Sequence, residues 1–237
     1  MKITPLLLIG AFAITSGNLW AASGRQDSIE RLQTSSDVLH SIMSAPDKGI
    51  PEEVMNGAKC IVVVPHLVKG GFVVGGEHGR GIASCRTVDG WSAPAFVSVG
   101  GGSWGLQIGV EGVDLVMVIM NDSGLQHLLS SKFQISGDAS ASAGPVGRHA
   151  SAGTDWTLNT EVLTYSRSRG IFAGITLNGA VVEQDTDSTR AIYGGDPSFR
   201  AILSGDVRAP KSTLGFIQAV VDTGHAGTVA EVTPSQQ

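Results

Sequence analysis

Ser103 is the one serine whose sequence setting suggests nucleophilic chemistry. The run Gly101-Gly102-Ser103-Trp104-Gly105 fits the G-x-S-x-G pattern, in which a sharp turn between a strand and a helix presents the nucleophile. After Ser103, apolar residues alternate with glycine and glutamine up to Val110, which indicates a strand and not a helix. The sequence therefore favours a turn serine at this position over a hydrolase nucleophile.

Metal and nucleotide sites find little support in the sequence. The six histidines include no H-x-x-x-H pair, and a metal site needs several ligands that converge. The glycines between positions 70 and 81 lack the lysine–serine ending of a phosphate-binding loop. We therefore expect no metal, no cofactor and no enzymatic activity.

Basic residues beside glycines are the remaining chemical signal. They are Lys69, Arg80, Arg148, Arg167 and Arg169. Exposed backbone N–H groups together with a cation can hold a phosphate group. The alternative is that these cations are scattered surface charges, which is the usual position of lysine and arginine.

The two cysteines, Cys60 and Cys85, are even in number, which suits a disulfide in an exported chain. Closing a loop of about 25 residues would stabilise the fold by roughly 3 kcal/mol on the chain-entropy model. Two buried free thiols are the alternative. Neither His66 nor His78 has a spacing from these cysteines that indicates a thiol enzyme.

The first residues resemble a secretory signal peptide. Lys2 precedes an apolar run from Leu6 to Ile14, and small residues follow up to Ala22. Cleavage after Ala21 would release a mature protein into an oxidising space. We expect a periplasmic or secreted location.

The rest of the chain predicts helices at both ends of a β-rich region. Asp27 is expected to cap a helix that runs to about Ala45, and Pro51 to begin a second, short helix. Further helices are expected after Asn121, after Asp196-Pro197 and after Pro210. Expected strands cover 60–64, 72–74, 81–86, 104–110, 113–120, 135–143, 158–165, 171–176 and 179–183.

This order of elements predicts an α+β fold, with a mainly antiparallel curved β-sheet or incomplete barrel and short helices at its two ends. No linker-like run divides the chain. The expected organisation is a signal peptide over 1–21, a helical lead-in over 22–57, a β-rich domain over 58–195, and short helices with a loose tail over 196–237. The net charge of −5 argues against nucleic acid as a partner.

Several ordered segments resemble the SYLF domain family. They are Ala58–Pro65, Lys69–Gly76, Gly90–Phe96, Gly105–Gly109, Ala143–Arg148, Tyr165–Gly174 and Tyr193-Gly194. The resemblance covers roughly 54–195. It implies a non-enzymatic domain that binds phospholipid, with actin binding in some fungal members.

For an exported chain, the resemblance points to anionic phospholipid or a membrane surface as the partner. The cations expected to contact the headgroups are Lys69, Arg148, Arg167 and Arg169. A structural or protein-interaction module of the bacterial envelope, with no lipid ligand, is the alternative. The lead-in helix carries Glu30, Arg31 and Asp37 and so has no cationic face, which argues against docking through a basic amphipathic helix.

Overall fold

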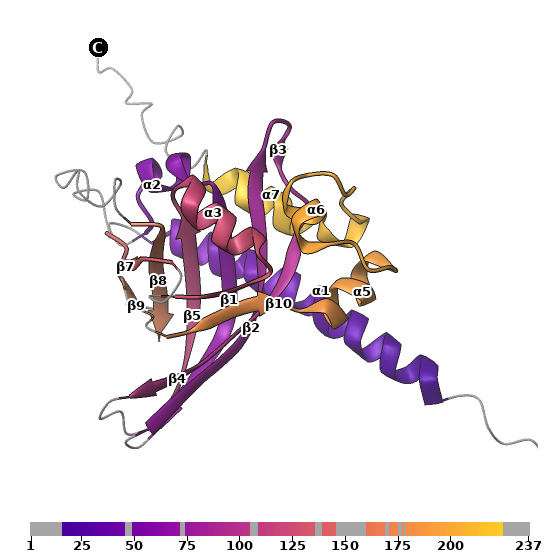
Figure 1. The fold of residues 1–237 in the computed structure, drawn as a ribbon, viewed down its shortest axis with the longest axis horizontal. Coiled ribbons are helices and arrows are strands. Elements are labelled where there is room, and N and C mark those ends of the chain that lie inside the picture. The colour runs from indigo at the N-terminus through magenta and orange to yellow at the C-terminus, as the bar shows by residue number, and fades with distance from the viewer. Residues whose placement is uncertain are drawn as a thin grey trace, which may run out of the picture.

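The computed structural model describes residues 16–45, 49–71, 74–104, 109–135, 139–145, 160–168, 171–174, 177 and 179–224. These residues form one curled sheet with helices on both of its sides (Figure 1). The strand order is β6-β10-β4-β2-β1-β5-β8-β7, with β3 paired to β2 and β9 paired to β8. All pairings are antiparallel except that of β7 with β8. The predicted fold class is confirmed.

The strands are bounded as follows. They are β1 (Cys60–Gly71), β2 (Val74–Thr87), β3 (Gly90–Trp91), β4 (Ala95–Trp104), β5 (Gly109–Ile119), β6 (Lys132–Gln134), β7 (Ala141–Ala143), β8 (Val162–Ser168), β9 (Ile171–Gly174) and β10 (Val181–Gln184). The centre of the sheet consists of the long strands β4, β2, β1 and β5.

The central strands extend further than the hydrophobic pattern predicts. β1 continues seven positions past Val64, and β2 begins well before Gly81. These extensions are rich in glycine and polar residues, so their strand conformation follows from pairing with neighbours and not from intrinsic preference. The expected strand over 104–110 is wrong: β4 ends at Trp104, β5 begins at Gly109, and 105–108 lie outside the described residues.

The expected strand over 135–143 is also only partly found. The structure shows β7 over its last three residues and an isolated bridge between Ile135 and Ala139, and 136–138 lie outside the described residues. Small residues bury little apolar area, so their alternation does not by itself produce a long strand. The edge strand β6 and helix α5 (Thr186–Tyr193) were not predicted.

The remaining helices agree with the predicted positions. They are α1 (Ser16–Met43), α2 (Glu52–Gly57), α3 (Asp122–Leu129), α6 (Phe199–Leu203), the 3₁₀ turn η2 (Lys211–Thr213) and α7 (Leu214–Thr223). The Asn121 side chain caps α3 by accepting a hydrogen bond from the Gly124 N–H. α1 begins at Ser16, so the prediction that Asp27 caps it is wrong: the helix continues through that residue.

The sheet separates two hydrophobic clusters. Alternate residues of one strand point to opposite faces, so Val62 and Leu115 join an inner cluster while Ile61 and Val116 join an outer one. α3 and α6 pack in the inner cluster. α1, α2, α5 and α7 contribute to the outer cluster, and Figure 1 shows α1 and α7 on the opposite side of the sheet from α3. The terms inner face and outer face below refer to these two sides.

Cys60 and Cys85 face each other across β1 and β2 and form a disulfide with an S–S distance of 2.03 Å. Both side chains lie in the inner cluster and are buried. The predicted bridge is therefore confirmed, and it joins the two central strands at the end nearest to α2.

Candidate functional site

The structure describes two of the four cations that the sequence selected, and it places these two on opposite faces of the sheet. Lys69 points to the inner face, where its Nζ lies 3.4 Å from Glu77 Oε2. Arg167 points to the outer face, opposite Asp114 of β5. Arg148 and Arg169 lie outside the described residues. Lys69 and Arg167 therefore do not contribute to one binding surface.

Arg167 belongs to a cluster with Asp114 and His66 on the outer face. Its Nε and Nη2 donate to Asp114 Oδ2 at 3.0 and 2.6 Å. The backbone N–H of His66 donates to Asp114 Oδ1 at 3.1 Å, and His66 Nδ1 lies 3.8 Å from the same oxygen. The Asp114 side chain is only 8% exposed, so its charge is held almost entirely by these partners.

His66 owes its position to an irregularity in β1. The pairing of β1 shifts between Val63 and Val68 against β2 and between Val64 and Leu67 against β5. His66 has φ of +53°, a conformation that few non-glycine residues adopt. The Asp114 carboxylate binds the N–H that this bulge leaves outside the sheet ladder. The bulge leaves the His66 side chain 80% exposed beside the ion pair.

Two more basic side chains, one histidine and one arginine, point outward on the neighbouring strand β2. His78 and Arg80 share the face of buried Ile82, because they lie at alternate positions of β2. His78 pairs with Val68 of β1 and Gly100 of β4, and Arg80 pairs with Ser98 of β4. Both side chains are exposed, and within the described part of the chain neither forms an ion pair or a side-chain hydrogen bond.

Glycines make this part of the outer face flat. A Cβ atom on Gly112 would meet no described atom within 4 Å, and one on Gly100 would meet only the carbonyl of Glu77 at 3.8 Å and His78 Nδ1 at 4.0 Å. In contrast, a Cβ on inward-facing Gly81 would lie 2.4 Å from the Val63 carbonyl oxygen. The inward-facing glycines allow close packing, whereas the described atoms leave open space above the outward-facing glycines.

We call this region the outer shelf and define it by His66, Val68, His78, Arg80, Gly100 and Gly112. The central strands run past α1 here, as Figure 1 shows for β1, β2 and β4. Val68, in the middle, is 47% exposed. The outer shelf therefore combines cations, one exposed apolar side chain and a glycine floor.

A buried ion pair fixes α1 at the border of the outer shelf. Arg31 Nη1 lies 3.0 Å from Asp185 Oδ2 and 3.2 Å from Ser188 Oγ, and its guanidinium lies 5.7 Å from the centre of the Phe96 ring. Burial alone would raise the pKa of Asp185, but hydrogen bonds from Ser188 and the charge of Arg31 outweigh it and hold that pKa below its ordinary value. Arg80 is close enough to repel the Arg31 charge.

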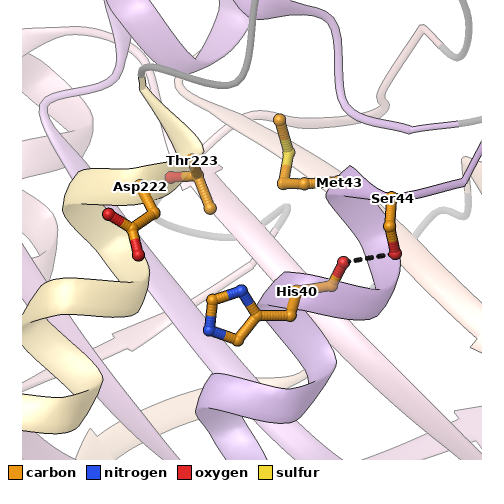
Figure 2. Close-up of a pocket in the computed structure, with 5 residues that line it drawn as sticks. All are labelled: His40, Met43, Ser44, Asp222 and Thr223. Carbon is orange, nitrogen blue, oxygen red and sulfur yellow. Dashed lines mark hydrogen bonds between the residues drawn. The ribbon is translucent and has the colours of Figure 1, made fainter. Parts of the chain in front are cut away.

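A small pocket of about 270 Å³ lies between the ends of α1 and α7. Figure 2 shows His40, Met43 and Ser44 of one segment across from Asp222 and Thr223 of the other. The hydroxyls of Ser44 and Thr223 donate to carbonyls of their own helical turns, at His40 and Val220. Asp222 accepts from Gln218. These groups are already used within the helices, so the pocket offers a ligand few free partners.

One serine, histidine and carboxylate do converge, at Ser123, His127 and Glu161. Ser123 Oγ donates to Glu161 Oε1, and His127 Nε2 lies 3.9 Å from the same oxygen. A catalytic triad places the imidazole between the hydroxyl and the carboxylate. Here the carboxylate lies between them, and it also accepts from the Ser140 N–H at 2.7 Å. The cluster ties α3 to the β7–β8 edge of the sheet.

Three further possibilities, a nucleophile elbow at Ser103, a metal site and a membrane-spanning helix, find no support among the described residues. Ser103 lies within β4, paired with Gly75, which is not the strand–turn–helix setting of a nucleophile elbow. Among the described residues, no three His, Cys, Asp or Glu side chains are grouped closely enough to hold a metal ion. No helix in the described ranges has both the length and the apolar character needed to cross a bilayer.

Sequence reasoning missed His66 and His78 as surface groups and did not select Arg80. A signal for two of them was present, because His78 and Arg80 alternate with Gly79 and Gly81 along the chain. Such alternation in a strand places two cations on one face and two glycines on the other. The bulge that exposes His66 had no comparable sequence signal.

Comparison with known proteins gives one family. The model of the Ysc84 family, described as "Las17-binding protein actin regulator", matches residues 100–223. An SH3 domain-containing protein of Schizosaccharomyces pombe is 36% identical over 165 residues, which are 68% of this chain and 38% of the relative.

Relatives in other organisms match this chain at similar identity and over a similar length. SH3 domain-containing YSC84-like protein 1 of Homo sapiens is 32% identical over 169 residues, 70% of this chain and 49% of the relative. LAS seventeen-binding protein 3 of Saccharomyces cerevisiae is 32% identical over 168 residues, 69% of this chain and 36% of the relative. The chain spans half the length or less of these curated relatives. From the family match over more than half of its residues, the chain belongs to the Ysc84, or SYLF, domain family.

Proposed function

We propose that this chain is an exported, non-enzymatic protein that binds anionic phospholipid through its SYLF domain. The observation that carries the proposal is the outer face of the sheet, where the side chains of His66, His78 and Arg80 lie exposed on β1 and β2. On the outward positions of the described central strands, Asp114 is the one carboxylate, and Arg167 holds it. Cations beside exposed apolar area attract an anionic membrane surface.

The family assignment supports a binding role. The relatives are named for what they bind or for an SH3 domain, and not for a reaction. The convergence of Ser123, His127 and Glu161 has the wrong order for nucleophilic catalysis. The segment with a basic start and an apolar run before Ala21 supports export.

One experiment tests both parts of the proposal. The full chain is produced in a Gram-negative host, recovered from the periplasmic extract, weighed by mass spectrometry, and floated with vesicles of phosphatidylglycerol and phosphatidylcholine at low salt. We expect a mature protein that begins at Ala22 and rises with these vesicles, but not with phosphatidylcholine alone. Retention in the cytoplasm would overturn export, and a protein that stays at the bottom of the gradient would overturn lipid binding.

A protein-interaction role in the envelope is the second candidate. The family description and the relative named LAS seventeen-binding protein 3 favour it, because both specify a protein partner. The same preparation distinguishes the two roles. A stable partner that co-purifies with a protein free of lipid, together with no flotation, would favour the interaction role.

A further inference from the structure

We propose that the outer shelf is the seat for the phospholipid headgroups, with Arg80 and His78 as the contacts to phosphate and Val68 as the apolar contact. The inference rests on the proposed function, because it names the surface of the SYLF domain that would carry it. In this inference Arg80 and His78 take the place of Lys69 as headgroup contacts, because Lys69 points to the inner face and pairs with Glu77.

The positions of the charges favour an anionic occupant. Arg80 and His78 lie on adjacent outward positions of β2, and His66 lies on the next strand beside Asp114. Asp114 does not contact Arg80 or His78: Arg167 donates twice to its Oδ2, and its Oδ1 accepts from the His66 N–H. The chain as a whole carries −5 with histidine counted as neutral, so the positive charge of Arg80, flanked by the imidazole groups of His66 and His78 as further hydrogen-bonding groups, runs against the average charge of the protein. Such local charge complementarity orients a protein on an anionic surface.

The glycine floor provides room for a headgroup beside these cations. Gly100, His78, Val68 and Gly112 form one row across β4, β2, β1 and β5. The two ends of this row have no side chain, and a Cβ on Gly112 would meet no described atom within 4 Å. An anion can therefore approach His78 from the Gly100 side, where it can lie close to the backbone, and it can approach Val68 from the Gly112 side.

Val68 makes this surface suitable for a membrane. It is one of three large hydrophobic side chains that are exposed among the described residues, and it is 47% exposed. It lies directly between His78 and Gly112 in the row. An apolar side chain surrounded by cations can enter the region between headgroups and acyl chains while the cations remain at the phosphates. A soluble anion would gain nothing from Val68.

The test compares flotation of the wild-type chain with two sets of shelf variants, on the same phosphatidylglycerol-containing vesicles. In the first set, Arg80→Glu with His78→Glu reverses the charge of the shelf. We expect at least about a tenfold weaker partition, from the contribution of each basic residue at an anionic surface. Its control is Arg208→Glu with Lys211→Glu, which changes the net charge at least as much at exposed positions before α7.

The second set keeps the test valid if the first shelf variant does not fold. Gly112→Glu and Gly112→Gln place side chains of one size in the same open space, and only Glu adds charge. We expect the Glu variant to bind about fivefold more weakly than the Gln variant, the effect of one charge near the surface. Thermal melting of each variant establishes that it is folded.

Each result has one meaning. If the wild-type chain does not float, the proposed function is wrong. If it floats and the shelf variants float equally well, or the control loses binding as much as they do, the shelf inference is wrong while lipid binding stands. If light scattering shows a wild-type dimer that Gly112→Glu dissociates, a second copy occupies the shelf and the inference is overturned.

Discussion

At the scale of single residues, the strongest polar interactions of this protein hold elements in place. Arg31 and Asp185 have side chains only 9% and 11% exposed, and they join α1 to the start of α5. Asp185 is also the N-cap of α5 and accepts from the Ser188 N–H at 3.0 Å. Breaking such a pair leaves an uncompensated charge in a buried position. The pair therefore determines where α1 crosses the sheet.

The lowered pKa of Asp185 predicts acid sensitivity. Because its folded-state pKa lies below the unfolded value, the carboxylate stabilises the fold above the unfolded pKa, and this contribution is lost as the pH falls through the folded pKa. Asp185→Asn should lower the free energy of unfolding by about 2–3 kcal/mol at pH 7. It should also make the free energy of unfolding vary less with pH below about 4. Urea unfolding of the variant and the wild-type protein, at pH 7 and at a pH below about 4, measures both free-energy differences.

The control for that variant is Asp187→Asn, two residues away on α5. The Asp187 side chain is 94% exposed and pairs only with Arg190 on the surface. We expect a change below about 0.5 kcal/mol and the wild-type pH dependence. An Asp185→Asn variant with unaltered pH dependence would show that this carboxylate does not control acid stability.

At the scale of elements, the hairpin of β1 and β2 is the centre of the molecule. β1 pairs with β5 on its other side, and β2 pairs with β4. The Cys60–Cys85 disulfide crosses the hairpin at its open end, and the two cysteines are 25 positions apart in the sequence. A bridge between such partners restricts the unfolded chain, because it closes the whole hairpin into a loop.

Removing this bridge should lower stability without changing the fold. The Cys60→Ala, Cys85→Ala double variant should lose about 3 kcal/mol of unfolding free energy. Both side chains are buried, so the bridge of the native wild-type protein should resist mild reductant. When reductant and a thiol reagent are present together, the bridge should be reduced and its cysteines labelled only after unfolding. Denaturant titration and thiol labelling followed by mass spectrometry provide the two measurements. Rapid labelling of the reduced cysteines in the folded protein would contradict the burial of the bridge.

At the scale of the whole molecule, both hydrophobic clusters depend on the same strands. β1 contributes Ile61 to the outer cluster and Val62 to the inner one, and β5 does the same with Val116 and Leu115. Loss of either cluster exposes one face of these strands. The helices on the two sides of the sheet are therefore coupled through it, and Tyr193 of α5 packs against both clusters.

This shared sheet predicts a single unfolding transition. Leu39→Ala truncates the outer cluster from α1, and Phe199→Ala truncates the inner one from α6. Each should lower the unfolding free energy by about 3–4 kcal/mol, and far-ultraviolet circular dichroism and tryptophan fluorescence should still show one coincident transition. Two separate transitions, each moved by only one of the variants, would show that the layers unfold independently.

The sequence by itself determined the class of fold, the family and the cysteine pair. The β-branched run of β1, the helix start at Asn121 and the helices after Asp196 and Pro210 follow from local patterns, and the structure has elements at all of them. Local patterns suffice here because alternation, capping and proline act over a few residues. The extensions of β1 and β2 were missed, because glycine-rich segments become strands only when neighbours pair with them.

Only the tertiary structure decided which face each cation occupies. In the sequence, Lys69 and Arg167 look alike, since both lie beside or near a glycine. The sheet nevertheless turns Lys69 toward Glu77 on the inner face and Arg167 toward Asp114 on the outer face. The bulge between Val64 and Leu67 changes the alternation along β1 and exposes His66. The facing of a strand residue depends on its register with partners distant in the chain, and one irregular residue reverses it.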